Sequence, residues 1–231
     1  MHLIVLDPNN PEQQFPSVSE ALSVPDGLLA MGGCLSEIRL LNAYRQGVFP
    51  WNSPDEPILW WSPNPRLVLF PDKLTITRSL AKTLRKRKFV FTVDRSFVDV
   101  VKACAKPRRL EKSTWITEDI LQAYGRLHTS GYAHSAEAWL NDELVGGLYG
   151  VAIGQVFFGE SMFFTHTDAS KVAFAHLVEQ LKAWGYKLID CQVSTQHLIS
   201  FGAEELSRVE FASLLNTYCE QLPLPSAWQY P

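Results

Sequence analysis

The segment 156–193 constrains the fold of this chain more than any other part of its sequence. It begins with the run VFFGESMFF, aromatic and mostly uncharged, which predicts a strand over 156–164. An amphipathic helix is predicted over 170–184, and a second strand over 186–193. A strand, a helix and another strand in succession indicate a domain in which helices pack on a central sheet.

The second strand of this segment carries two polar residues, Asp190 and Gln192. Because side chains alternate along a strand, both are expected on one face, with Ile189 and Cys191 on the other. A carboxylate beside an amide is unusual on an otherwise apolar strand, so this pair is a candidate site, together with Glu160 on the neighbouring strand. In the structural alternative, Asp190 caps a turn, Glu160 pairs with an arginine and Gln192 is a hydrogen-bonded polar residue.

The order of these elements resembles the core of GNAT-type acyltransferases, in which a turn that cradles phosphates precedes the helix. Here the turn is THTDA, residues 165–169, which has no glycine and places Asp168 where a pyrophosphate would lie. Coenzyme A is therefore a poor candidate for the acyl donor, and no cofactor is expected.

The composition is that of an ordinary soluble globular protein, with 46% hydrophobic and 19% charged residues. No apolar stretch reaches the roughly 20 residues of a membrane-spanning helix. The start of the chain, MHLIVLDP, lacks the basic residues and long apolar run of a signal peptide, so a cytoplasmic protein is expected. The cysteines form no C-x-x-C pair and the histidines no H-E-x-x-H pattern, which argues against a metal site and a disulfide framework.

Charge is distributed unevenly, although the net charge is only −3. The segment 73–112 contains 13 Lys and Arg against 3 Asp and Glu, which leaves 8 basic and 21 acidic residues elsewhere. Such asymmetry predicts a polyanionic partner on one surface and a cationic partner on another. The candidate phosphate contacts are four consecutive residues, Arg85, Lys86, Arg87 and Lys88. The alternative is a solvated helix face over 78–88 and a basic loop over 106–112.

Prolines and tryptophans crowd the segment 48–66. It holds five prolines and three tryptophans among 19 residues, which excludes a regular helix and predicts rigid, extended turns. We place a domain boundary here, between a small loop-rich N-terminal domain over 1–65 and a larger domain over 66–231. Strands over 134–139 and 144–153 are predicted to run antiparallel to the strand over 156–164.

Ordered blocks throughout the sequence resemble the bacterial leucyl/phenylalanyl-tRNA–protein transferase family. In the first part of the chain they are GLLAMGG at 27–33, the segment 47–66, TWI at 114–116 and AHS at 133–135. In the second part they are LVGGLYG at 144–150, GESMF at 159–163, ASK at 169–171, LIDCQV at 188–193 and GA at 202–203. Cys34, Asp168 and Phe201 depart from the family pattern, and none of them is a proposed catalytic residue.

The resemblance implies an α+β protein with a small N-terminal domain and a GNAT-like domain built on a mixed, mainly antiparallel sheet. It also implies an enzyme that moves Leu, Phe or Met from aminoacyl-tRNA to the N-terminal Arg or Lys of acceptor proteins, which marks them for degradation. An aminoacyl-tRNA donor agrees with two features of the residues themselves, the basic segment and the absence of a coenzyme A turn.

Roles for the three polar residues follow from this chemistry. The ester of an aminoacyl-tRNA is already activated, so positioning supplies much of the rate and a proton acceptor a further ~10²–10⁴-fold. The carbonyl oxygen of Gln192 is expected to accept a hydrogen bond from the attacking amine. Asp190 is expected to orient Gln192 and to stabilise the developing ammonium, and Glu160 to complete the network or hold the incoming positive charge.

Aromatic and apolar residues are candidates for binding the donor. Trp51 and Trp115 are expected to stack on the 3′-terminal adenosine of the tRNA, in a site that Tyr124 helps to frame. The alternative is that these tryptophans are core residues. An apolar pocket for the donor side chain is expected to be lined by Phe157, Met162, Phe174 and Leu177. The helical spacing of the last two is equally typical of a core helix.

A second possible function belongs to a different class, a non-catalytic RNA-binding protein with a degenerate acyltransferase core. It accounts for the basic segment and the tryptophans but gives Asp190, Gln192 and Glu160 no role. A transfer assay with charged tRNA and a substrate with N-terminal Arg distinguishes the two functions.

Overall fold

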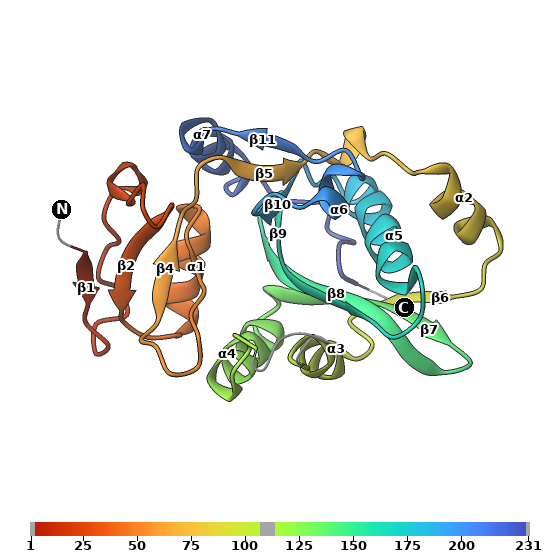
Figure 1. The fold of residues 1–231 in the computed structure, drawn as a ribbon, viewed down its shortest axis with the longest axis horizontal. Helices are drawn as coiled ribbons and strands as arrows, with labels where there is room; N and C mark the ends of the chain where they lie inside the picture. Colours follow the sequence, from red (N-terminus) through yellow and green to blue (C-terminus); the bar gives the residue numbers. More distant parts are fainter. Residues whose placement is uncertain (1–2, 107–113, 230–231) are drawn as a thin grey trace.

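The computed structural model describes residues 3–106 and 114–229, which form two sheets and the helices around them (Figure 1). The smaller sheet has four strands in the spatial order β1-β2-β4-β3. Strands β1 (Ile4–Leu6) and β2 (Leu28–Gly32) pair in parallel, whereas β4 (Leu59–Trp61) pairs antiparallel with β2 and with β3 (Phe49–Pro50). The short 3₁₀ helix η1 (Val18–Glu20) and the helix α1 (Glu37–Arg45) belong to the same part of the chain.

The larger sheet has seven strands in the order β11-β5-β10-β9-β8-β7-β6. Their bounds are β5 (Arg66–Leu69), β6 (Val90–Val93), β7 (Ala133–Leu140), β8 (Glu143–Ile153), β9 (Val156–Phe164), β10 (Leu188–Gln192) and β11 (Glu204–Leu206). In this sheet β9 and β10 pair in parallel and all the other neighbours pair antiparallel. The prediction of a mixed, mainly antiparallel sheet in an α+β protein is therefore confirmed.

Helices cover both faces of the larger sheet (Figure 1). Helix α5 (Ala169–Ala183) connects β9 to β10 and lies on one face, which explains the parallel pairing because such a connection must cross over the sheet. Helices α3 (Phe97–Cys104) and α4 (Glu118–Thr129) lie on the other face. The remaining elements are η2 (Pro71–Lys73), α2 (Arg78–Arg85), α6 (Gln196–Ile199) and α7 (Arg208–Tyr218).

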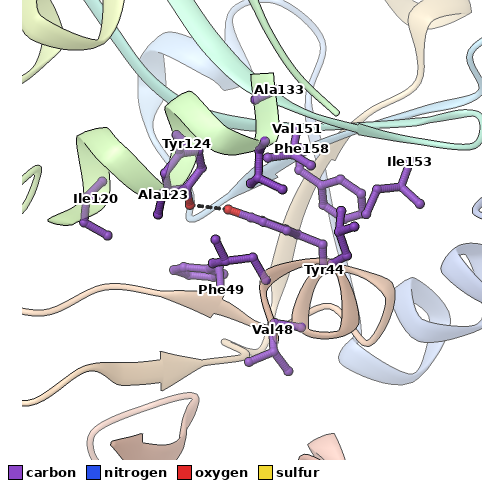
Figure 2. Packing of buried hydrophobic residues seen from close by; sticks show 14 of the residues in the cluster. Tyr44, Val48, Phe49, Ile120, Ala123, Tyr124, Ala133, Val151, Ile153 and Phe158 are labelled. Atoms are coloured by element: carbon purple, nitrogen blue, oxygen red, sulfur yellow. Dashed lines mark hydrogen bonds between the residues drawn. The ribbon is translucent and has the colours of Figure 1, made fainter. Parts of the chain in front are cut away.

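Two clusters of buried side chains correspond to the two faces. The α5-side cluster lies between the larger sheet and α5 and includes Phe157, Phe174 and Leu177. The α4-side cluster includes Tyr124 and Phe158 and extends without interruption into the smaller sheet and α1. Figure 2 shows this junction, where Tyr44 of α1 points across to Tyr124 of α4. The division into domains at residue 65 stays a prediction. The α4-side cluster contains buried residues from both before and after this boundary.

The secondary structure agrees with the main expectations from the sequence. The predicted strand–helix–strand unit is present as β9, α5 and β10, and the expected antiparallel run is β7, β8 and β9. Most of the predicted basic loop, residues 107–112, lies outside the described residues. Across 3–106 and 114–229, none of the helices combines the length and the apolarity that crossing a bilayer requires.

Candidate active site

Glu160 lies at a bulge in β9. Along the β8–β9 ladder, Gly150 pairs with Gly159 and the next residue of β8, Tyr149, pairs with Ser161. Glu160 is therefore an extra residue without a partner in β8. A bulge of this kind bends the strand and redirects a side chain out of the regular alternation. Glu160 is only partly exposed, and its carboxylate points toward α1 and α4.

A second bulge interrupts β10 at the neighbouring position. Asp190 pairs with Val68 of β5, whereas Gln192 pairs with Leu67, so Cys191 is the extra residue. The backbone of Gln192 has φ +62°, which is uncommon for a residue other than glycine. The alternation that the sequence predicts over 186–193 thus ends at Asp190, because the bulge rotates the chain there.

The two bulges occur where β9 and β10 stop pairing. Their parallel ladder ends with the pair Phe158 and Asp190. Beyond it, the side chains of Glu160 and Gln192 meet, with Nε2 of the amide donating to Oε1 of the carboxylate at 3.1 Å. Within residues 3–106 and 114–229, no hydrogen bond reaches the amide oxygen of Gln192, so this oxygen can accept one from a bound molecule.

Two tyrosines hold the carboxylate of Glu160. The hydroxyl of Tyr44 donates to Oε1 at 2.7 Å and the hydroxyl of Tyr124 donates to Oε2 at 2.9 Å. The two hydroxyls also contact each other, as the dashed line in Figure 2 shows. The three groups therefore form a closed ring of three oxygen–oxygen contacts. Two tyrosines supply only two protons, and a third is present when Glu160 itself is protonated.

The environment of Glu160 raises its pKa from 4.5 to about 7. Burial is the largest cause, because it penalises the charged carboxylate. The hydrogen bonds from Tyr44 and Tyr124 lower the pKa, the charge of Asp190 raises it and the charge of Arg66 lowers it. Glu160 can therefore exchange a proton near neutral pH. Burial also raises the pKa values of both tyrosines well above 10.0, so they remain neutral donors.

Asp190 lies behind this group and is fully buried. Its Oδ2 accepts from Arg66 at 2.6 Å, and its Oδ1 accepts from Arg66 at 2.8 Å and from the backbone N–H of Gln192 at 2.9 Å. Both oxygens are thus occupied by the protein. The structure brings Asp190 to the backbone of Gln192 rather than to a surface that an acceptor amine could reach.

The three aromatic candidates for the adenosine site differ in exposure. Trp51 follows β3, is 53% exposed and rests edge-on against Trp61, with 5.9 Å between the ring centroids. Trp115 is partly buried against the α4-side cluster, shortly before α4 begins. Tyr124 is fully buried, and its hydroxyl binds Glu160. Trp51 therefore offers the most accessible ring for stacking. Tyr124 instead belongs to the hydrogen-bonded polar group of Glu160, Tyr44, Tyr124 and Gln192.

The four candidates for the donor pocket lie together on the α5 side of the larger sheet. Phe157, Phe174 and Leu177 are at most 3% exposed, and Met162 is partly buried against the same cluster. Cys191, the extra residue of the β10 bulge, packs against this cluster as well. The cluster therefore borders the place where β9 and β10 separate.

The four basic candidates lie at the end of α2. Arg85 is its last residue, and Lys86 to Lys88 form the exposed turn that leads to β6. None of the four forms an ion pair with another described residue. Their charges are thus available to a polyanion.

Two residues of the site were not expected from the sequence, Tyr44 and Arg66. Tyr44 lies three residues after Leu41 in α1, and this helical spacing by itself indicates a core role. Arg66 precedes the apolar run LVLF, and a charged residue at the start of a buried strand was a signal for a buried ion pair. No group of three His, Cys, Asp or Glu side chains suited to a metal occurs in the described part of the chain.

The chain matches two family models, described as leucyl/phenylalanyl-tRNA protein transferase over residues 68–216 and its N-terminal domain over residues 33–64. It is 54% identical over 228 residues to a leucyl/phenylalanyl-tRNA–protein transferase of Methylococcus capsulatus, covering 99% of this chain and 97% of that protein. It is 57% identical over 202 residues to the protein of the same name from Nitrosomonas europaea, covering 87% and 86%. Among solved structures, a GCN5-related N-acetyltransferase from Kribbella flavida is similar with a TM-score of 0.40 and 12% identity, covering 72% of this chain and 60% of that one.

Proposed function

The chain belongs to the leucyl/phenylalanyl-tRNA–protein transferase family, and from this premise we propose that it transfers Leu, Phe or Met from aminoacyl-tRNA to proteins that begin with Arg or Lys. The acceptor would thereby gain an N-terminal residue that marks it for degradation in the cytoplasm. Family membership supports the aminoacyl-tRNA donor and the protein acceptor. The choice of side chains on both substrates is the finer part of the proposal.

The observation that carries the proposal is the fixed amide of Gln192. Its nitrogen is held by Glu160, which leaves its oxygen directed away from that contact and available as an acceptor. An α-amino group that donates a hydrogen bond to this oxygen is oriented for attack on the ester carbonyl. Positioning of this kind accounts for a large part of the rate when the ester is already activated.

The reaction forms one bond and breaks one. The amine nitrogen bonds to the ester carbonyl carbon, and the bond from that carbon to the ribose oxygen of the tRNA breaks. One proton leaves the amine and one proton ends on the ribose oxygen. The net result is a peptide bond and a free tRNA hydroxyl, without a cofactor.

Glu160 is the proposed acceptor of the amine proton. Its pKa of about 7 makes the carboxylate a competent base that still releases the proton afterwards. Tyr44 and Tyr124 hold both of its oxygens and share the proton within the ring. Asp190 acts through the backbone of Gln192, so stabilising the ammonium is assigned to Glu160 instead.

The remaining candidates bind the donor in this proposal. Trp51 and Trp115 stack on the terminal adenosine, whereas Tyr124 acts by holding Glu160. Arg85 to Lys88 contact phosphates farther along the tRNA. The apolar side chain of the donor enters the α5-side cluster where β9 and β10 separate, next to Met162.

Transfer of labelled Phe from tRNA to a peptide with N-terminal Arg tests the proposal. The parent protein should form labelled peptide, and Gln192→Ala should lower the rate about 10²-fold while tRNA affinity stays within about threefold. Gln180→Ala on α5 is the matched control and should behave like the parent. Binding of aminoacyl-tRNA without any transfer would favour the RNA-binding alternative instead.

A further inference from the structure

Arg66, the first residue of β5, is 1% exposed, and each of its three guanidinium nitrogens donates one hydrogen bond. Its guanidinium binds Asp190 through two bonds, Nε to Oδ1 at 2.8 Å and Nη2 to Oδ2 at 2.6 Å. Nη1 donates to the carbonyl oxygen of Gly47 at 3.2 Å. The ring centroids of Phe49 and Phe211 each lie 4.7 Å from its Cζ. Because the guanidinium is planar and bonded on several sides, these partners fix it in a single orientation.

Asp190 transmits this constraint to Gln192. The same Oδ1 that binds Arg66 accepts the backbone N–H of Gln192 across the extra residue Cys191. This bond stabilises the uncommon backbone conformation of Gln192, with φ +62°. That conformation in turn directs the amide to Glu160.

We propose that Arg66 is a positioning residue for aminoacyl transfer. It holds Asp190, Asp190 holds the bulge, and the bulge presents the amide of Gln192 to the attacking amine. The inference rests on the proposed function. Through Gly47 and Phe49, Arg66 also contacts the segment that leads to Trp51.

A purely structural ion pair would leave a different signature. Breaking a buried pair lowers stability wherever the pair lies, because a charge loses its partner. A positioning residue additionally changes the turnover of the folded enzyme, and it does so only while the residue that it positions is present. The coupling between Arg66 and Gln192 therefore separates the two roles.

Arg66→Lys keeps the charge and removes the planar fork. We expect kcat to fall about 10–100-fold, with KM for aminoacyl-tRNA changed by less than about threefold. The matched control is Arg39→Lys. Arg39 is also fully buried, donates to the carbonyl oxygens of Asn10 and Gln13 and lies 5.2 Å from the ring centroid of Phe15. The control should lower Tm to a similar extent and leave kcat unchanged.

The decisive measurement repeats Arg66→Lys in a Gln192→Ala background. There its effect on kcat should shrink to less than about twofold, because the amide is gone. A fall in kcat by the same factor in both backgrounds, or an equal fall in kcat in Arg39→Lys, would overturn the positioning role.

If Arg66→Lys does not fold, Phe211→Leu takes its place. This substitution removes one ring beside the guanidinium and keeps its bonds to Asp190, and its effect on kcat is again compared with and without Gln192→Ala. An inactive parent protein would refute the proposed function, and this inference with it, whereas an active parent with uncoupled effects refutes only the inference.

Discussion

Among the single residues of this chain, Glu160 has the chemistry that depends most on its surroundings. In water its carboxyl would be ionised throughout the neutral range, but burial raises its pKa to about 7. The two tyrosines that bind it are themselves buried and remain protonated. One carboxyl group can therefore both accept and release a proton near pH 7.

The pH dependence of transfer should show this carboxyl directly. With Glu160 as the base, kcat should rise with pH through an inflection near 7 and then level off. Glu160→Gln should remove that inflection and lower the plateau about 10²-fold, while the ionisation of the acceptor amine near 7.7–8.0 remains in kcat/KM. Glu179→Gln, exposed on α5, is the control. An unchanged inflection in Glu160→Gln would assign it to another group.

Stability should depend on the same residue with a defined sign. The folded state binds the proton of Glu160 more tightly than the unfolded state, because the pKa is raised from 4.5 to about 7. Between these values the folded state holds more protons, so the free energy of unfolding decreases as pH rises from about 4.5 to 7. Denaturant unfolding at several pH values should show a flatter dependence in Glu160→Gln than in the parent. A steeper dependence would contradict the raised pKa.

At the level of elements, the site depends on two bulges in adjacent strands. Gly150 lies opposite Gly159, directly beside the β9 bulge. A Cβ at Gly150 would lie 2.2 Å from the carbonyl oxygen of Phe158 and 2.6 Å from the ring of Phe157. This close approach shows why the ladder needs a glycine where β9 bends.

Replacing this glycine should therefore weaken the sheet at the bulge. Gly150→Ala is expected to lower the free energy of unfolding by about 1–3 kcal/mol or more, because backbone atoms must move apart. Gly125 of α4 offers the opposite case, since a Cβ there meets nothing within 4 Å. Gly125→Ala should raise stability by up to about 1 kcal/mol through helix propensity. Equal effects of the two substitutions in urea unfolding would contradict the steric explanation.

At the scale of the whole molecule, the smaller sheet and the larger sheet share the candidate site. Glu160 and Gln192 belong to the larger sheet, whereas Tyr44 lies on α1 beside the smaller one. The basic turn after α2 leads into β6, an edge strand of the larger sheet, and lies away from α1 in Figure 1. A partner that engages both must be extended, as a tRNA is.

The salt dependence of tRNA binding tests this extended contact. Neutralising Arg85, Lys86, Arg87 and Lys88 together should reduce the slope of log affinity against log salt by up to about 3–4, close to one unit per phosphate contact. Turnover at saturating tRNA should stay near the parent value, because these residues lie outside the polar group. Lys187 is an exposed residue directly before β10, so Lys187→Gln is the control and should leave the slope unchanged. A slope equal to the parent's would place the tRNA elsewhere.

Much of this protein follows from local sequence. The aromatic run of β9, the amphipathic pattern of α5 and the apolar run of β10 predict the strand–helix–strand unit, because periodicity reflects which face is buried. Asp190 and Gln192 can be identified as candidate site residues because burying polar side chains on an apolar strand costs free energy unless they have partners.

The tertiary structure alone decided how those residues meet. A bulge is a mismatch between two strands, so neither Glu160 nor Cys191 can be identified as an extra residue from its own strand. Tyr44 and Arg66 reach the site from segments 116 and 124 residues away from their partners Glu160 and Asp190. Their sequence neighbourhoods predict only a helix and a strand start. Their roles depend on which surfaces pack together, and that is set by the whole core rather than by any local pattern.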